Sequence, residues 1–230
     1  KSGDLDVCTP TFNKKNELSV QEMYHPLIEN CVSNKISLFG KSMLLTGSNM
    51  SGKTTFIKTV AVNSIVAQTL NICFATAYAA PFYKIHSSIR ITDDLLENTS
   101  YYLQEVLTIK ELIDASNDKN PCLFVLDEIF KGTNTIERIS GGKAILSYLN
   151  KEQHTVLVST HDIELTELLQ KDNYELYHFS EHIENNELFF DHKIKSGKLK
   201  TRNAIQILNL YAYPQEIIKD AKDIEKTYFS

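Results

Sequence analysis

The sequence predicts an α/β fold, with a mostly parallel sheet flanked by helices and followed by a β-hairpin and a helical tail. Apolar runs alternate with stretches of helical spacing between residues 42 and 170, a pattern typical of parallel strands connected by helices. One run, CLFVLDE (122–128), is apolar until its two final acids, as expected of a central strand buried on both faces. Beyond residue 170, apolar and polar residues alternate, which favours a half-buried hairpin.

The elements of the core follow one another along the chain. Three consecutive apolar residues form the first strand, and a glycine-rich turn then opens a long helix. Leu103, Val106, Leu107 and Leu112 share one face of a later helix with a period of about 3.6 residues. The expected strands are 42–46, 85–91, 122–128 and 155–159, and the expected helices are 52–70, 101–115, 135–151 and 163–170.

Three segments are expected along the chain. Residues 1–40 carry proline and glycine turn signals around short apolar runs and are expected to form a β-rich lead-in. Residues 41–200 are expected to form the core, including two alternating strands joined around 184–186. Residues 201–230 have a helical pattern broken near Pro214. No shift in composition separates this tail from the core, so one domain with a C-terminal extension is predicted.

Composition and charge indicate an ordinary globular chain. Its 230 residues are 42% apolar and 23% charged, enough for one α/β domain with a full core. The net charge of −5 argues against a strongly basic nucleic-acid surface. Four scattered cysteines without a C-x-x-C pair indicate reduced thiols and a cytoplasmic location. Because the chain begins at Lys1 rather than at methionine, we expect a piece of a longer protein.

One apolar stretch, residues 60–82, has to be compared with a membrane span. Asn63, Gln68, Asn71 and Pro81 interrupt it. It also follows a glycine-rich loop, where a helix normally packs against the sheet. A buried helix and a strand are therefore expected, and no membrane is expected for this segment.

Residues 46–55, TGSNMSGKTT, fit the phosphate-binding pattern G-x-x-x-x-G-K-[ST] between a predicted strand and a predicted helix. In such a loop, backbone N–H groups at a helix N-terminus surround an anion, and glycines allow the tight path. Lys53 is expected to reach the β- and γ-phosphates of ATP, and Thr54 to supply a hydroxyl to Mg²⁺. The alternative is a plain glycine turn. The expected nucleotide-binding residues are Gly47, Ser48, Asn49, Met50, Ser51, Gly52, Lys53, Thr54 and Thr55.

Two acids, Asp127 and Glu128, end the buried strand, and such strand ends lie beside the phosphate loop. Asp127 is expected to hold the Mg²⁺ shell through water, and Glu128 to polarise the water that attacks the γ-phosphate. The alternative is that both acids merely end a strand in solvent.

His161 ends the next strand, in LVSTHD (157–162). Taken alone, it is interpreted as a surface or helix-capping residue. Beside a phosphate loop and an acidic pair, it is interpreted as a sensor of the γ-phosphate. The expected catalytic residues are therefore Glu128, His161 and Lys53.

Two serine-containing motifs have alternative interpretations. Ser140, Gly141 and Gly142 resemble the signature of ABC transporters, but they follow the acidic strand, whereas that signature precedes it. They are interpreted as small residues that pack a helix against the sheet. Before the acidic strand, Ser100 either caps helix 101–115 or points at a phosphate held by a partner subunit.

Together the motifs resemble the ATPase domain of the MutS family of DNA mismatch repair proteins. The family's segments TGPNMGGKST and DEIGRGTST stand here as TGSNMSGKTT and DEIFKGTNT. STHDIEL (159–165) resembles the family's ATH-x-x-EL, and YPQEIIKDA (213–221) resembles its last helix. The resemblance covers nearly all of the chain. Matching positions elsewhere are Tyr24, His25, Pro26, Asp93, Asp94, Ser100 and Glu105.

The resemblance implies an ABC-type P-loop ATPase that works with Mg²⁺ and ATP as a head-to-tail homodimer with composite sites. Ser100 would contact the γ-phosphate held by the partner, and the loop 132–135 would cross the dimer seam. The C-terminal helices would help to hold the dimer. ATP turnover would report to DNA through domains outside this chain.

The sequence departs from the family's pattern in ways that suggest a divergent member. Ser48 and Ser51 replace a proline and a glycine in the loop. The family stacks adenine on an aromatic near 31–34, where none stands here, so the sequence predicts phosphate binding without predicting purine selectivity. Phe130 and Lys131 replace Gly-Arg, and Tyr101 and Tyr102 replace Thr-Phe.

Two functions are left open by the sequence. The first is an ATP-hydrolysing domain of a MutS-like DNA mismatch repair or recombination protein. The second is a nucleotide-gated dimerisation module with little hydrolysis and no mismatch recognition, and measured ATP turnover distinguishes the two. An ABC-type ATPase of another branch would need a signature that ENTSYYLQE (97–105) does not provide.

Overall fold

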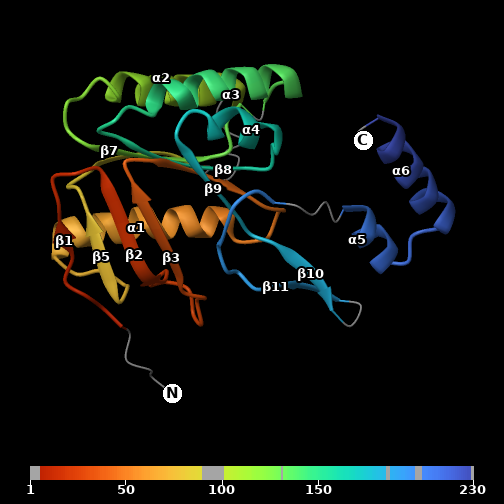
Figure 1. Cartoon of the computed structure of the whole chain (residues 1–230), viewed down its shortest axis with the longest axis horizontal. Helices are drawn as coiled ribbons and strands as arrows, with labels where there is room; N and C mark the ends of the chain where they lie inside the picture. Colours follow the sequence, from red (N-terminus) through yellow and green to blue (C-terminus); the bar gives the residue numbers. More distant parts are fainter. Residues whose placement is uncertain (1–5, 90–100, 131, 185–186, 200–203, 229–230) are drawn as a thin grey trace.

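One long helix, α1 (Lys53–Leu70), lies between two β-sheets. The computed structural model of the chain describes residues 6–89, 101–130, 132–184, 187–199 and 204–228. Figure 1 shows the larger sheet between α1 and a layer of further helices, and the strands of the smaller sheet crossing α1 in this view. Residues of the smaller sheet pack with α1 in one core.

The larger sheet has six strands in the order β12-β9-β4-β8-β7-β6. All neighbours pair in parallel except β12, which is antiparallel to β9. The predicted core strands are confirmed to within a few residues. The strands are β4 (Ser42–Thr46), β6 (Lys84–Ser88), β7 (Cys122–Asp127), β8 (Thr155–Thr160), β9 (Tyr174–His178) and β12 (Lys195–Ser196).

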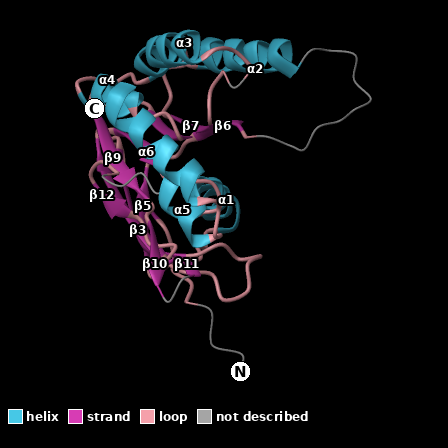
Figure 2. Ribbon diagram, turned by 90° about the vertical axis from the view of Figure 1, so that its right-hand side faces the viewer, coloured by secondary structure: helices cyan, strands magenta, loops and turns pink. Residues whose placement is uncertain are grey.

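The apolar run of β7 is explained by burial on both faces. Leu123 and Val125 pack in the core with α1, whereas Phe124 and Leu126 pack in the core on the opposite face. Side chains alternate between the faces of a strand, so a strand covered on both sides must be apolar at every position. The second core is covered by α2 (Tyr101–Ala115), α3 (Thr135–Leu149) and α4 (Glu164–Gln170). Figure 2 shows α2 and α3 on one side of β6 and β7, and α1 on the other.

The smaller sheet combines the lead-in with a strand from after α1. Its order is β1-β5-β2-β3, so β5 (Ala77–Ala80) lies between two strands of the lead-in. β5 pairs in parallel with β1 (Thr11–Phe12) and antiparallel with β2 (Glu17–Met23), which in turn pairs with β3 (Asn34–Phe39). The stretch after α1 is therefore the strand that the sequence predicts, and it ties the lead-in to the core.

The polar residues that interrupt the apolar stretch of α1 satisfy backbone groups. Asn63 donates from Nδ2 to the Tyr24 carbonyl at 3.1 Å. Gln68 accepts from the Tyr83 N–H at 2.6 Å and donates to its carbonyl at 3.0 Å. Asn71 ends the helix with φ of 56°, the left-handed conformation common at helix C-termini. Within the described ranges, no helix has the length and apolar character needed to cross a membrane.

The predicted hairpin is confirmed, but each of its strands is interrupted. Next to the predicted turn, β10 (Glu181–Glu184) pairs with β11 (Glu187–Phe190), and further along the same two segments β9 pairs antiparallel with β12. β9 also joins the larger sheet beside β4, which the sequence does not predict. Tyr174 and Leu176 are buried in the core with α3 and α4, which places β9 in the sheet. The alternating pattern runs on past residue 178 without a break, so it hides the interruption between β9 and β10.

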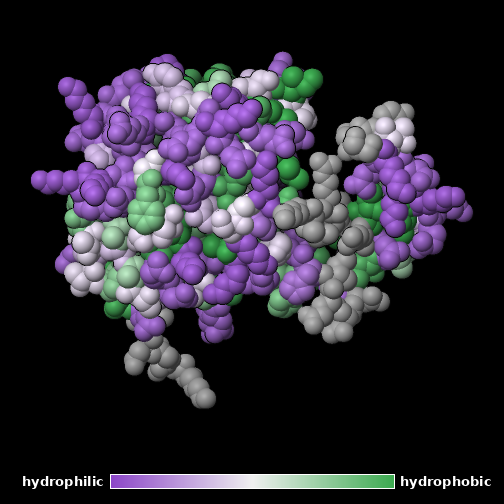
Figure 3. Space-filling model, in the orientation of Figure 1, coloured by the Kyte–Doolittle hydropathy of each residue, from purple (hydrophilic) through white to green (hydrophobic). Residues whose placement is uncertain are grey.

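Two short helices follow, α5 (Ala204–Leu210) and α6 (Gln215–Tyr228), as the sequence predicts on either side of Pro214. They stand to one side of the sheets in Figure 1. Figure 3 shows the same face as largely hydrophilic, with apolar atoms in small separate areas. On α6, Ile218 is buried, whereas Ile217 and Ile224 remain 48% and 47% exposed.

A buried histidine joins the end of α2 to the sheet. His154 Nδ1 accepts from the Cys122 N–H at 3.2 Å, and Nε2 lies 3.0 Å from the Ser116 carbonyl. A ring nitrogen that accepts carries no proton, so the imidazole is neutral with its hydrogen on Nε2. Burial lowers the pKa of His154 below its usual value.

This histidine makes stability depend on pH. Because its pKa is lower in the folded state, its contribution is fully present above about pH 6.5 and is lost as the pH falls below that value. We expect the free energy of unfolding in urea to fall between about pH 7.5 and about pH 5.5 more steeply in the wild type than in His154→Gln. Glutamine can make the same two hydrogen bonds without titrating, and equal pH slopes would contradict the prediction.

Candidate active site

A glycine-rich loop connects β4 to α1. Gly47 and Gly52 have φ of 153° and 107°, which glycine adopts more readily than other residues. A Cβ on Gly47 would lie 2.9 Å from Ser51 Oγ and 3.0 Å from the Phe179 carbonyl oxygen. No side chain caps the N-terminus of α1, which begins at Lys53. The strand before the loop and the helix after it are as predicted, and what the loop binds stays a prediction.

Lys53 is buried and folds back over the loop. Its ammonium donates to the carbonyls of Gly47 at 2.7 Å and Ser48 at 2.9 Å. These bonds keep a positive charge against the backbone of the loop, where two carbonyl acceptors satisfy it. The loop therefore presents a cation together with the N-terminal end of a helix, and both attract anions.

The first acid of the predicted pair lies beside the loop. Asp127 Oδ2 accepts from the Thr54 hydroxyl at 2.7 Å, and Oδ1 accepts a short hydrogen bond from the Ser159 hydroxyl. Thr54 belongs to α1, Asp127 ends β7 and Ser159 lies on β8. Two predicted metal-binding residues are thus brought together, and Ser159 is a neighbour that sequence analysis missed.

The second acid and the histidine face one another. Glu128 is buried in a left-handed backbone conformation with φ of 61°, and its N–H donates to the Ser159 carbonyl at 2.8 Å. His161 Nδ1 lies 3.3 Å from Glu128 Oε1, and its Nε2 lies 3.9 Å from Asp162 Oδ1. His161 is half exposed, so one side of the ring remains open to solvent.

An ion pair lies next to this histidine. The Arg138 guanidinium donates to both oxygens of Asp162, from Nε at 2.8 Å and from Nη2 at 2.7 Å. The sequence does not predict this pair, because its members lie on different elements. One signal was present: a cation in the first turn of a helix is unfavourable without a carboxylate partner.

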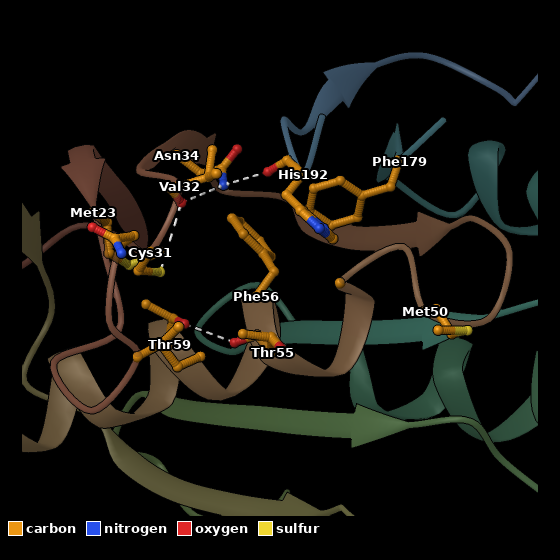
Figure 4. A pocket seen from close by; sticks show the side chains of 13 residues that line it. Met23, Cys31, Val32, Asn34, Met50, Thr55, Phe56, Thr59, Phe179 and His192 are labelled. Carbon is orange, nitrogen blue, oxygen red and sulfur yellow. Dashed lines mark hydrogen bonds between the residues drawn. The ribbon is translucent and has the colours of Figure 1, made fainter. Parts of the chain in front are cut away.

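A pocket of about 350 Å³ opens beside the first turn of α1 (Figure 4). No aromatic residue stands at 31–34, as the sequence indicates, but three rings reach the pocket from other elements. They are Phe56 of α1, Phe179 after β9 and His192 after β11. Phe56 and Phe179 pack edge to face with ring centres 6.0 Å apart. Figure 4 shows Phe179 and His192 on the side of the pocket away from Met23 and Cys31, with Phe56 between the two sides.

Both ends of the β10–β11 hairpin contact the glycine-rich loop. At the start of the hairpin, the Ser48 hydroxyl donates to Glu181 Oε2 at 2.8 Å. Just after its end, His192 Nδ1 lies 3.0 Å from the Ser51 carbonyl. The loop is thus held at two points by residues far away in the sequence. Alternating strand patterns do not predict such contacts.

Of the small residues 140–142, Gly141 and Gly142 pack closely, but against the loop after β7 rather than the predicted sheet, and Ser140 is exposed. A Cβ on Gly141 would lie 2.9 Å from the Phe130 ring, and one on Gly142 would lie 3.0 Å from Ile129. Phe130 also lies against Tyr102 of α2, with ring centres 6.4 Å apart. Phe130 and Tyr102, which both depart from the family pattern, are therefore in contact.

Other predicted positions cannot be located. Asp93, Asp94, Ser100 and Lys131 lie outside the described residues.

The class of protein follows from this arrangement. A mixed α/β fold, with a glycine-rich loop, two acids and a histidine at one sheet edge, is compatible with a P-loop ATPase. Residues 43–228 match the family model of MutS domain V. The chain therefore belongs to the MutS family and corresponds to its C-terminal ATPase domain.

Individual relatives agree with the family model. The chain is similar to the DNA mismatch repair protein MutS of Listeria monocytogenes serotype 4a (strain HCC23), with 33% identity over 230 residues covering 94% of this chain and 26% of the relative. MutS of Lactobacillus delbrueckii subsp. bulgaricus is 31% identical, over 97% of this chain and 27% of the relative. MutS of Staphylococcus aureus (strain JH9) is 30% identical, over 94% of this chain and 26% of the relative. The chain thus spans about a quarter of the length of these curated relatives.

The close packing around Gly47 gives a prediction about stability. Gly47→Ala is expected to lower the free energy of unfolding by about 3 kcal/mol, because a positive φ and two short contacts act together. Gly40→Ala is the matched control, since Gly40 has φ of 65° and no atom within 4 Å of the place that a Cβ would take. It is expected to cost about 1 kcal/mol. If urea denaturation gave the same loss in free energy of unfolding for both variants, the contacts around Gly47 would be readily relieved.

Proposed function

We propose that this chain binds ATP with Mg²⁺ at the glycine-rich loop and hydrolyses it to ADP and phosphate. The observation that carries the proposal is that five predicted residues lie together at the carboxyl ends of β4, β7 and β8. These are Lys53, Thr54, Asp127, Glu128 and His161.

The loop supplies the phosphate site. Backbone N–H groups from residues 47–55 and the N-terminal end of α1 attract phosphate oxygens. The Lys53 ammonium, which otherwise donates to the loop carbonyls, donates to phosphate oxygens when ATP is bound. The pocket beside α1 takes the base, because Phe56, Phe179 and His192 offer apolar and aromatic surface there.

The residues at Thr54 and Asp127 fit Mg²⁺. Their side-chain oxygens lie 2.7 Å apart, and Mg²⁺ prefers oxygen ligands, taking few from the protein and the rest from water and phosphate. In the described part of the chain, no group of three or more His, Cys, Asp or Glu side chains could hold a metal ion. Thr54 and Asp127 would hold the ion, which would supply positive charge to offset that of the phosphates.

Glu128 acts as the general base in this proposal. It accepts a proton from water while the water oxygen bonds to the γ-phosphorus. The bond from phosphorus to the bridging oxygen breaks, and its electron pair stays on ADP. His161, at 3.3 Å from Glu128, holds the carboxylate in place and faces the γ-phosphate from its exposed side.

The test of this role is Glu128→Gln. Because glutamine keeps the shape but cannot accept the proton, phosphate release is expected to fall at least about 100-fold. The ATP dissociation constant is expected to stay within about threefold, as measured by equilibrium dialysis with Mg²⁺. Glu152→Gln, at an exposed carboxylate away from the loop, is the control. Unchanged turnover in Glu128→Gln would remove Glu128 from the mechanism.

We further propose that the chain dimerises through composite ATP sites, with Ser100 reaching the partner's γ-phosphate. Residues 41–200 would form the ATPase core and 201–230 the dimerisation tail. The exposed Ile217 and Ile224 support this, because they lie seven residues apart and form one apolar stripe on α6. All four cysteines are free, which is consistent with the predicted cytoplasmic location.

The relatives' name suggests the biological role. They are DNA mismatch repair proteins, and we propose that this chain couples ATP turnover to DNA held by domains outside it, in mismatch repair or recombination. The net charge of −5 is consistent with DNA contacts lying elsewhere.

Sedimentation velocity with Mg²⁺ and ATP, ADP or no nucleotide tests the dimer, with phosphate release assayed on the same samples. We expect a dimer only with ATP, and both dimerisation and turnover should be lost in Ser100→Ala. Turnover by a monomer that is indifferent to Ser100 would contradict the composite site. A dimer with ATP but no phosphate release would favour the nucleotide-gated dimerisation module.

A further inference from the structure

The ion pair between Arg138 and Asp162 lies directly behind His161. Two parallel hydrogen bonds of 2.8 and 2.7 Å join the side chains, which are only 15% and 6% exposed. Arg138 lies in the first turn of α3, and Asp162 follows His161 after the end of β8. The pair therefore connects the start of a helix with the turn that carries the histidine.

Neither the helix nor overall stability accounts for this pair. A cation near a helix N-terminus opposes the helix dipole. Removing two charges from water offsets much of their attraction, so a buried ion pair is weak evidence for stability. A bidentate guanidinium–carboxylate contact does fix distance and orientation, because two bonds must align at once. The pair therefore fixes the distance and orientation between the two side chains and the elements that carry them.

The position that it fixes is that of His161. The Asp162 N–H donates to the Thr160 hydroxyl at 3.0 Å, so the turn is held from its backbone as well as from its side chain. The imidazole then lies between two carboxylates, with Nδ1 at 3.3 Å from Glu128 and Nε2 at 3.9 Å from Asp162. Rotation of the ring would move both nitrogens away from these oxygens.

We propose that Arg138 and Asp162 are positioning residues that hold His161 against Glu128, an inference that rests on the proposed ATPase function. The Arg138 N–H donates to the Asn134 carbonyl at 2.9 Å, which is the first backbone hydrogen bond of α3. Arg138 therefore lies one turn after the loop that is predicted to cross the dimer seam.

The test replaces the whole pair, with Arg138→Met and Asp162→Leu together. Apolar residues of similar volume commonly replace a buried ion pair without loss of folding. The free energy of unfolding in urea should therefore be retained. We expect kcat for phosphate release to fall about 10- to 100-fold, with the ATP dissociation constant within about threefold. Asp162→Asn, which keeps the size of the side chain, should reduce kcat in the same range.

The matched control is Lys110→Met with Asp114→Leu, because this pair on α2 has a similar 2.6 Å contact but is exposed to solvent. It should leave kcat unchanged. Wild-type kcat in the folded Arg138→Met, Asp162→Leu protein would overturn the inference.

A second measurement separates this inference from the proposed function. The imidazole ¹⁵N resonances of His161, assigned with His161→Gln, are compared in nucleotide-free wild type and double variant. If the wild type releases no phosphate, the proposed ATPase function fails. The resonances alone then decide whether Arg138 and Asp162 position His161. Shifted resonances would then support the positioning role, and unshifted resonances would overturn it.

Discussion

The parallel pairing of β4, β8 and β7 is the constraint on which the rest of the molecule depends. The last residue of β4 is paired with the last of β8, and the last of β7 with the residue before it. Gly47, Glu128 and His161 therefore leave the sheet side by side. A slip of one residue would exchange the two faces of β7 and separate these three residues. The apolar residues that fix the register of the core thus also fix the geometry of the site.

The sheet also supports strained backbone at its edge. Glu128 and Phe130 both have positive φ, 61° and 56°, where a side chain costs about 1–2 kcal/mol. Such strain persists only where the surroundings determine the conformation, and it gathers at functional sites. Here a hydrogen bond from the Glu128 N–H to β8 and the packing of Phe130 on Gly141 supply those surroundings. The turn can therefore bring the Glu128 carboxylate to His161 instead of continuing the strand.

The sequence predicts the features that depend on neighbouring residues. Continuous apolar runs identify β4, β7 and β8, and the lysine and threonine of the loop follow from local spacing. Pairings between distant segments leave no such signal. The alternating pattern of β9 does not reveal that it pairs with β4 in the larger sheet as well as with β12. The aromatic residues of the pocket come from three separate elements, and Arg138 meets Asp162 only after α3 packs beside β8. The roles of the site residues remain predictions, although most of them are brought together.

The two contacts between the hairpin and the glycine-rich loop also bear on how this sequence can vary. Ser48 and Glu181 are 133 residues apart, yet one hydrogen bond joins them. The proline that the family places at residue 48 has no hydroxyl, so it cannot donate this bond. A change at either position alters the surroundings of the other. Residues 48 and 181 are therefore expected to change together among closely related sequences. Covariation between the hairpin stem and the loop would then record the contact in sequences alone.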